Sequence, residues 1–258
     1  MDVFLLFAFA VCEKKQADLV FLVDQSGSIN ANDYSLMKNF TIELMNSFNV
    51  SENFVRVGLA QFSDTFQDEF DLNKYYSTDD ITAHIQNKMD HTGGATRIGD
   101  ALKSIKDYFE ASRGGRRSDG ISQNLVLITD GDSDDDVEDA AIALRALGIE
   151  VFAIGIGNVH DLELLQITGT PQKLFTVQDF KSLEGIKQKV VKIICDSKPI
   201  ENPSGESKSV ALPLSLSSLL SHHVSLRLGL IETCFPLLQA AALISPWDSM
   251  FPEFVVTR

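Results

Sequence analysis

The sequence predicts an α/β fold in which a mostly parallel central sheet is covered by helices on both faces. Short apolar runs rich in β-branched and aromatic residues alternate along the chain with segments of helical periodicity. The runs 18–24, 124–130 and 149–157 are apolar at nearly every position, which is typical of strands buried on both sides. Segments 54–62 and 66–72 follow each other across a short turn, so we expect one antiparallel strand at an edge of the sheet.

The individual elements follow in chain order. Segment 18–24 is a strand that ends on Asp24, and segment 34–48 reads as an amphipathic helix with Asn32 or Asp33 as its N-cap. The remaining elements are the strands 54–62, 66–72, 124–130 and 149–157, an edge strand at 173–177, and helices at 81–89, 98–109, 137–148, 161–169 and 179–195. This order predicts a Rossmann-like, doubly wound sheet.

Polar side chains follow the strands at one predicted edge of this sheet. Asp24 ends the first strand and is followed by Ser26 and Ser28, whereas Asp130 ends a later strand and Thr96 follows a glycine pair ahead of a helix. In such sheets, ligands bind beyond the carboxyl ends of the strands. We therefore expect these oxygen ligands from three loops to converge on a hard cation, although the first stretch alone would also suit an ordinary polar turn.

Other motifs give weaker signals. The acidic run 132–136 invites a calcium interpretation, but a loop counted from Asp130 has Asp135 at its sixth position and Ala141 at its twelfth, where an EF-hand needs Gly and Glu. We expect these acids to lie at a helix N-terminus instead. His84 and His91 stand in polar company and are expected to be solvated. The chain contains neither a P-loop nor a G-x-S-x-G motif.

The two ends of the chain differ from its middle. Residues 1–10 resemble a secretory signal, because a short apolar run ends in Ala8-Phe9-Ala10, although Asp2 and the lack of Lys or Arg argue against it. The alternative is a first strand. Residues 197–258 are rich in Ser and Leu without a steady period, so we expect a disordered or loosely packed tail. The predicted domain is 11–196.

The net charge of −14 resides almost entirely in the first 196 residues. It argues against a nucleic-acid partner, because nucleic-acid binding draws its affinity from basic patches. Cation binding and simple solubility are both consistent with it.

The cysteines stand at 12, 195 and 234. If the chain is secreted, Cys12 and Cys195 can close a loop around the whole domain, which is worth about 5 kcal/mol in the chain-entropy model. The alternative is two unrelated buried thiols. Asn39 and Asn49 begin glycosylation triplets, which also arise often by chance.

The stretches DLVFLVDQSGSI, RVGLAQFSD, GGATRIGDAL and LVLITDG occur in that order and resemble the von Willebrand factor A domain family over about residues 17–196. The resemblance implies a metal-ion-dependent adhesion site on Asp24, Ser26, Ser28, Thr96 and Asp130, with Mg²⁺ as its ion and Mn²⁺ or Ca²⁺ as alternatives. It implies that the hydroxyls bind the ion directly and that the aspartates act largely through water.

The resemblance also implies a function. The terminal cysteines and the sequence near the last helix are most similar to type VI collagen and matrilin-like matrix domains, which favours a Cys12–Cys195 disulfide and secretion into the extracellular matrix. The expected function is adhesion, in which a protein partner offers a Glu or Asp to the metal, without nucleic acid, membrane span or catalysis. The alternatives are an integrin-type receptor domain and a metal-dependent hydrolase on the same sheet.

Overall fold

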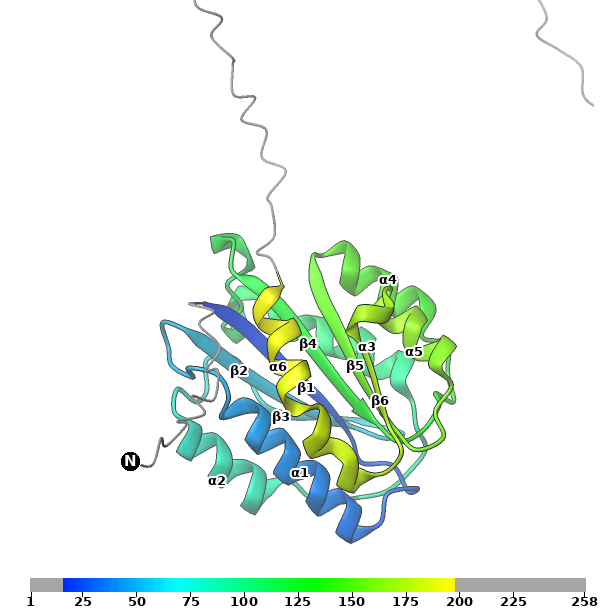
Figure 1. Ribbon diagram of the computed structural model, residues 1–258. Coiled ribbons are helices and arrows are strands. Elements are labelled where there is room, and N and C mark those ends of the chain that lie inside the picture. Colours follow the sequence, from blue (N-terminus) through cyan, green and yellow to red (C-terminus); the bar gives the residue numbers. More distant parts are fainter. Residues whose placement is uncertain (1–15, 198–258) are drawn as a thin grey trace, which may run out of the picture. The chain divides into compact units, whose positions relative to one another are not determined.

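The computed structural model describes residues 16–197, and in them one sheet runs in the order β3-β2-β1-β4-β5-β6 (Figure 1). All neighbouring strands are parallel except β2 and β3, which confirms the predicted antiparallel edge. The strands are β1 (Ala17–Asp24), β2 (Val55–Phe62), β3 (Phe66–Phe70), β4 (Ser122–Thr129), β5 (Ile149–Ile156) and β6 (Leu174–Val177).

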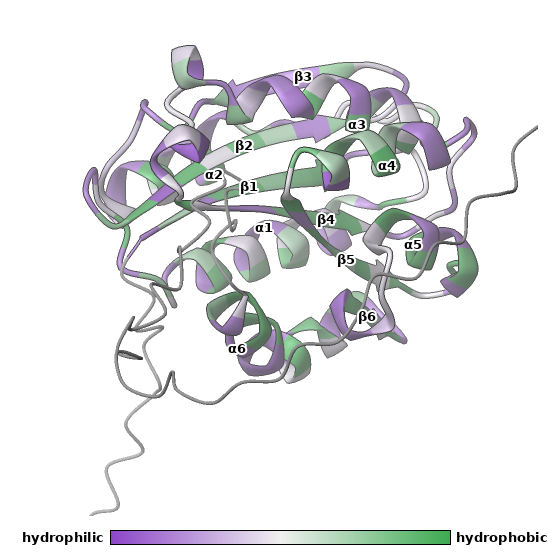
Figure 2. Cartoon of the chain, turned by 90° about the horizontal axis from the view of Figure 1, so that it is seen from above, coloured by the Kyte–Doolittle hydropathy of each residue, from purple (hydrophilic) through white to green (hydrophobic). Residues whose placement is uncertain are grey.

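Helices cover both faces of this sheet, as predicted. One apolar cluster joins the sheet to α1, α2, η5 and α6, and a second joins its other face to α3, α4 and α5. Figure 2 shows the hydrophobic strands β4 and β5 between these two helical layers. The helices are α1 (Ala31–Met45), α2 (Thr78–Lys88), α3 (Ile98–Ile105), α4 (Glu138–Ala146), α5 (Asp161–Thr168) and α6 (Lys187–Asp196), with 3₁₀ segments that include η1 (Lys106–Phe109) and η5 (Phe180–Ile186).

The start of α1 differs from the prediction. Asn30, in an extended conformation, is the N-cap, and its side-chain oxygen accepts the N–H groups of Asn32 at 3.0 Å and Asp33 at 3.1 Å. Asn32 and Asp33 were expected in this role, but both lie inside the first turn. All three residue types are good N-caps, so local preference did not identify which one starts the helix.

Strand β1 lies at the centre of the core. Its side chains alternate between the two apolar clusters, with Leu19, Phe21 and Val23 on one face and Val20 and Leu22 on the other, all fully buried. Because β1 pairs in parallel with both β2 and β4, the carboxyl ends of these strands meet at one edge of the sheet. This register brings the residues after β1 and β4 together.

A buried ion pair lies at the opposite edge, where β1 and β4 begin. Arg116 contacts the fully buried Asp18 through its Nη2 at 2.7 Å, and its backbone N–H donates to the same carboxylate at 2.6 Å. Near it, the hydroxyl of Ser197 donates to Asn124 Oδ1 at 2.9 Å. The first strand and the last helix of the described domain therefore both have an end at this edge.

The chain ends lie outside the described residues. The predicted signal at 1–10 and all but the first residue of the predicted tail at 197–258 lie there and stay predictions, as does the domain boundary at 196. Cys195 is disulfide-bonded, but both other cysteines fall outside 16–197, so its pairing with Cys12 also stays a prediction. Among the described helices, none combines the length and apolar character needed to cross a bilayer.

Candidate metal centre

The centre is built around Asp24, the last residue of β1. Its side chain is fully buried, and one carboxylate oxygen accepts the N–H of Ser26 at 2.7 Å. The other oxygen accepts the hydroxyl of Thr129, at the end of β4, also at 2.7 Å. Asp24 thus fixes the turn after β1 and ties it to the neighbouring strand.

Two serine hydroxyls continue from this carboxylate toward solvent. The Oγ atoms of Ser26 and Ser28 are 3.0 Å apart, and the hydroxyl of Ser28 donates to Asp130 Oδ1 at 2.7 Å. Metal–oxygen distances of 2.0–2.1 Å in an octahedral Mg²⁺ site would place neighbouring ligand oxygens about 2.9 Å apart. The spacing of the two serine oxygens is compatible with neighbouring ligands of one cation, while the 2.7 Å contact is the hydrogen bond that ties Ser28 to Asp130.

The third loop brings Thr96 to the same edge. Gly27, in the first loop, donates its N–H to the carbonyl of Gly94 at 2.9 Å. Gly94 has φ +118°, and a Cβ there would stand 2.4 Å from a carboxylate oxygen of Asp64, so the approach requires glycine. A Cβ on Gly131 would lie 3.7 Å from Thr96 Oγ1, which places the threonine hydroxyl beside the residue that follows Asp130.

Burial makes both carboxylates unfavourable as free anions. It raises the pKa of Asp24 to about 6, although the hydrogen bonds from Thr129 and Ser26 counteract part of the effect. Burial likewise raises the pKa of Asp130, and the hydrogen bond from Ser28 opposes it. A cation at this edge would compensate both charges, so the electrostatics of the site fit a metal.

The donor set consists mainly of hydroxyls. Within residues 16–197, no three His, Cys, Asp or Glu side chains gather closely enough to hold a metal ion. A cation here would therefore need the neutral oxygens of Ser26, Ser28 and Thr96. Such hard oxygen ligands suit Mg²⁺, Mn²⁺ or Ca²⁺ better than softer transition metals.

His91 lies half-buried beside this centre, whereas the sequence suggested a solvated side chain. Its Nε2 lies 2.9 Å from the carbonyl of Ser26, and since a carbonyl only accepts, this nitrogen donates. The ring of Tyr34 lies 4.9 Å away, centroid to centroid. Sequence reasoning missed this role because the contact joins residues from separate loops, with no short-range pattern between them.

His84 is buried, contrary to expectation. It is 8% exposed, and its Nε2 lies 2.8 Å from Glu69 Oε2. Glu69 in turn accepts the side-chain N–H of Gln61 at 2.7 Å, and Gln61 accepts the hydroxyl of Tyr34. A chain of buried polar contacts therefore runs from His84 in α2 through β3 and then β2 to Tyr34 in α1, the tyrosine that packs on His91.

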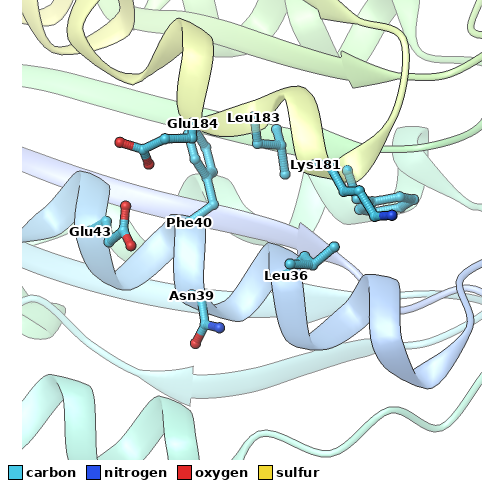
Figure 3. Close-up of a pocket in the computed structure, with 8 residues that line it drawn as sticks. Leu36, Asn39, Phe40, Glu43, Lys181, Leu183 and Glu184 are labelled. Carbon is cyan, nitrogen blue, oxygen red and sulfur yellow. The ribbon is translucent and has the colours of Figure 1, made fainter.

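A separate pocket of about 170 Å³ lies between α1 and η5 (Figure 3). Lys187 forms ion pairs with both Glu43 and Glu184, which line it. The volume of this pocket is below the range of typical small-molecule sites. The other labelled residues that line it are Leu36, Asn39, Phe40, Lys181 and Leu183.

The fold and the centre together define a class of protein, namely doubly wound α/β modules with an oxygen-rich centre beyond the strands of a parallel sheet. The family profile of the von Willebrand factor type A domain matches residues 18–189. The chain belongs to this family, as the sequence motifs indicated.

Its relatives include extracellular matrix proteins. The chain is 44% identical over 184 residues to the human collagen alpha-6(VI) chain, a match that covers 71% of this chain and 8% of that one. It is 34% identical over 224 residues to human matrilin-1, which covers 83% of this chain and 44% of matrilin-1. The chain therefore spans less than half the length of either relative.

A solved structure shows the same fold. Proximal thread matrix protein 1 from the mussel byssus matches with a TM-score of 0.67 and 34% identity, over 70% of this chain and 48% of that one, and its metal-ion-dependent adhesion site holds zinc. The printed names of the collagen VI and matrilin relatives are not those of enzymes. This agrees with the prediction that the chain is not an enzyme.

Proposed function

We propose that residues 11–196 form an extracellular adhesion module that binds protein partners through a Mg²⁺ ion. The observation that carries the proposal is the convergence of the Ser26 and Ser28 hydroxyls, 3.0 Å apart, with Asp130, which accepts the hydroxyl of Ser28 at 2.7 Å; such hard oxygens suit Mg²⁺. Thr96 stands beside the same edge. The mussel relative, which is 34% identical, has a metal-ion-dependent adhesion site that holds zinc, and this supports a metal site in the fold.

The chemistry of the donor set explains why a partner would bind. Mg²⁺ bound here would act as a Lewis acid, and this ion prefers six oxygen ligands. The three hydroxyls contribute no negative charge, and Asp24 is already engaged by Ser26 and Thr129. A partner Glu or Asp would therefore meet little competing charge from direct ligands, and its carboxylate would form a charge-assisted contact that can anchor an interface.

The names of the relatives support a matrix location. Collagen VI chains and matrilin-1 are matrix proteins, and we propose secretion into the same environment for this chain. Asn39, on α1, and Asn49, in the loop after it, are both exposed and available as glycosylation sites on a secreted protein. Both remain predictions that peptide mass spectrometry of secreted material would test.

The first experiment is titration calorimetry of the full-length chain with Mg²⁺. Asp130→Ala should abolish Mg²⁺ binding while the far-UV circular dichroism stays unchanged, because Asp130 lies at the sheet edge outside both apolar clusters. Asp107→Ala, which removes an exposed acid from η1, is the matched control and should bind as wild type does. Undiminished affinity in Asp130→Ala would overturn the assignment.

The second experiment tests adhesion itself. The full-length chain is immobilised and exposed to matrix extract in Mg²⁺, in Mn²⁺, in Ca²⁺ and in excess chelator. Partners that bind in Mg²⁺ and are released by the chelator support the proposal, and their absence from the Asp130→Ala column assigns them to this centre. Partners held equally in chelator would show adhesion through another surface.

A further inference from the structure

Helix α3 begins without a side-chain cap of its own. Its first N–H groups are bound instead by the loop that follows β4. The N–H groups of Gly99 and Asp100 donate to the two carboxylate oxygens of Asp135, each at 2.8 Å, and the N–H of Ile98 donates to the hydroxyl of Ser133 at 3.0 Å. A carboxylate from a distant loop therefore caps the helix and complements its dipole.

The same loop holds the backbone of Thr96. The N–H of Thr96 donates to Asp134 Oδ2 at 2.9 Å, and the N–H of Asp134 donates back to the carbonyl of Thr96 at 2.7 Å. A Cβ on Gly99 would stand 2.1 Å from the carbonyl oxygen of Asp136, so the loop packs directly on the start of α3. The N–H and the carbonyl of Thr96 are thus both bound to this loop, and only its side chain remains to extend toward the sheet edge.

The loop after β4 is itself held in place by contacts within the loop and with α5. The hydroxyl of Ser133 donates to Asp135 at 2.7 Å, and its N–H donates to Glu163, in the first turn of α5, at 2.8 Å. Asp130 begins this same loop. The segment that carries one predicted metal residue, Asp130, therefore also sets the position of another, Thr96.

We propose that Asp134 and Asp135 are positioning residues of the metal centre, which hold Thr96 against the loop of Asp130. The inference rests on the proposed function. It gives the acidic run a defined role, because these carboxylates are used on N–H groups of the Thr96 loop and of α3 rather than on a second cation. Neither residue touches the metal in this role, so each acts through Thr96.

The test compares Mg²⁺ affinities of full-length variants by calorimetry. Asp135→Ala and, as a milder change, Asp134→Ala should each weaken Mg²⁺ binding by about 10- to 100-fold, as for other residues that orient metal ligands. Asp139→Ala removes an equal, exposed charge from α4 and should change the affinity by less than about threefold, since exposed charges are screened.

A second readout needs no metal. In chelator, Asp135→Ala should increase hydrogen exchange at the amides of Gly99 and Asp100, and Asp134→Ala should increase it at Thr96, whereas Asp139→Ala should leave all three unchanged. If the wild type binds Mg²⁺ but neither substitution weakens binding, or if they weaken it without increasing hydrogen exchange at these amides, the positioning role is wrong and the proposed function stands. A wild type that binds no Mg²⁺ overturns the proposed function itself.

Discussion

Replacing Asp24 by Asn should stabilise the metal-free protein while abolishing Mg²⁺ binding. Asp24 is fully buried, and burial raises its pKa from 3.8 to about 6. With about 1.4 kcal/mol for each pH unit between these values, the ionised carboxylate lowers the free energy of unfolding by about 3 kcal/mol at pH 7. Asn keeps the shape and an acceptor for the N–H of Ser26 but carries no charge.

The sign of the pH dependence follows from the raised pKa. The folded state holds the proton of Asp24 more tightly than the unfolded chain does, so ionisation destabilises the fold. This penalty is absent below about pH 3.8, grows between there and about pH 6, and is complete above it. The advantage of Asp24→Asn should thus fall from about 3 kcal/mol at pH 7 to about half of that at pH 5.

Urea unfolding of both proteins in chelator, at pH 7 and pH 5, measures these differences. Saturating Mg²⁺ should then raise the stability of the wild type but leave Asp24→Asn unchanged, because ligands stabilise only the state that binds them. A variant less stable than wild type at pH 7, or a difference that does not shrink at pH 5, would refute the assignment of a buried, charge-penalised Asp24. Retained Mg²⁺ affinity in the variant would refute its place in the centre.

Three further predictions concern the rest of the domain. Arg116→Ala should lower the free energy of unfolding by about 3–5 kcal/mol in urea titrations, because it leaves the buried Asp18 without its counter-charge; a loss below about 1 kcal/mol would contradict this. Non-reducing peptide mapping of secreted protein should find Cys195 linked to Cys12, and a link to the third cysteine would disprove that pairing. Truncation after Ser197 should shift the melting temperature by only a few degrees in calorimetry, as expected for a loss under about 1 kcal/mol; a truncated chain that fails to fold would show that the boundary is wrong.

Strand ends were the most informative part of the sequence. Asp24 and Asp130 each follow an apolar run, and parallel pairing of β1 and β4 must bring such positions to one edge. The antiparallel pair β2–β3 followed from a short turn between two alternating runs. These features follow from the apolar pattern of each strand and from the rule that parallel strands place their carboxyl ends at one edge. The structure confirms the predicted fold.

Contacts between loops could not be predicted in this way. The acids after β4 were expected at a helix N-terminus, and Asp135 does cap one, but the helix is α3, which precedes them in the chain. His84 and His91 looked solvated because their sequence neighbours are polar, whereas their partners Glu69 and Ser26 come from other segments. Hydrogen bonds between residues of distant segments produce no periodic pattern in the sequence.

The buried polar edge opposite the metal centre has a mechanical consequence. Strand β1 starts there beside Asp18, and Ser197, after α6, is bonded there to Asn124. Tension transmitted along a chain that continues on both sides of the module would enter and leave at this edge. With Cys195 linked to Cys12 as predicted, that covalent bond would carry the tension between the two ends of the domain, so the Asp18–Arg116 pair and the oxygens at the far ends of the strands would both lie outside the path of the load.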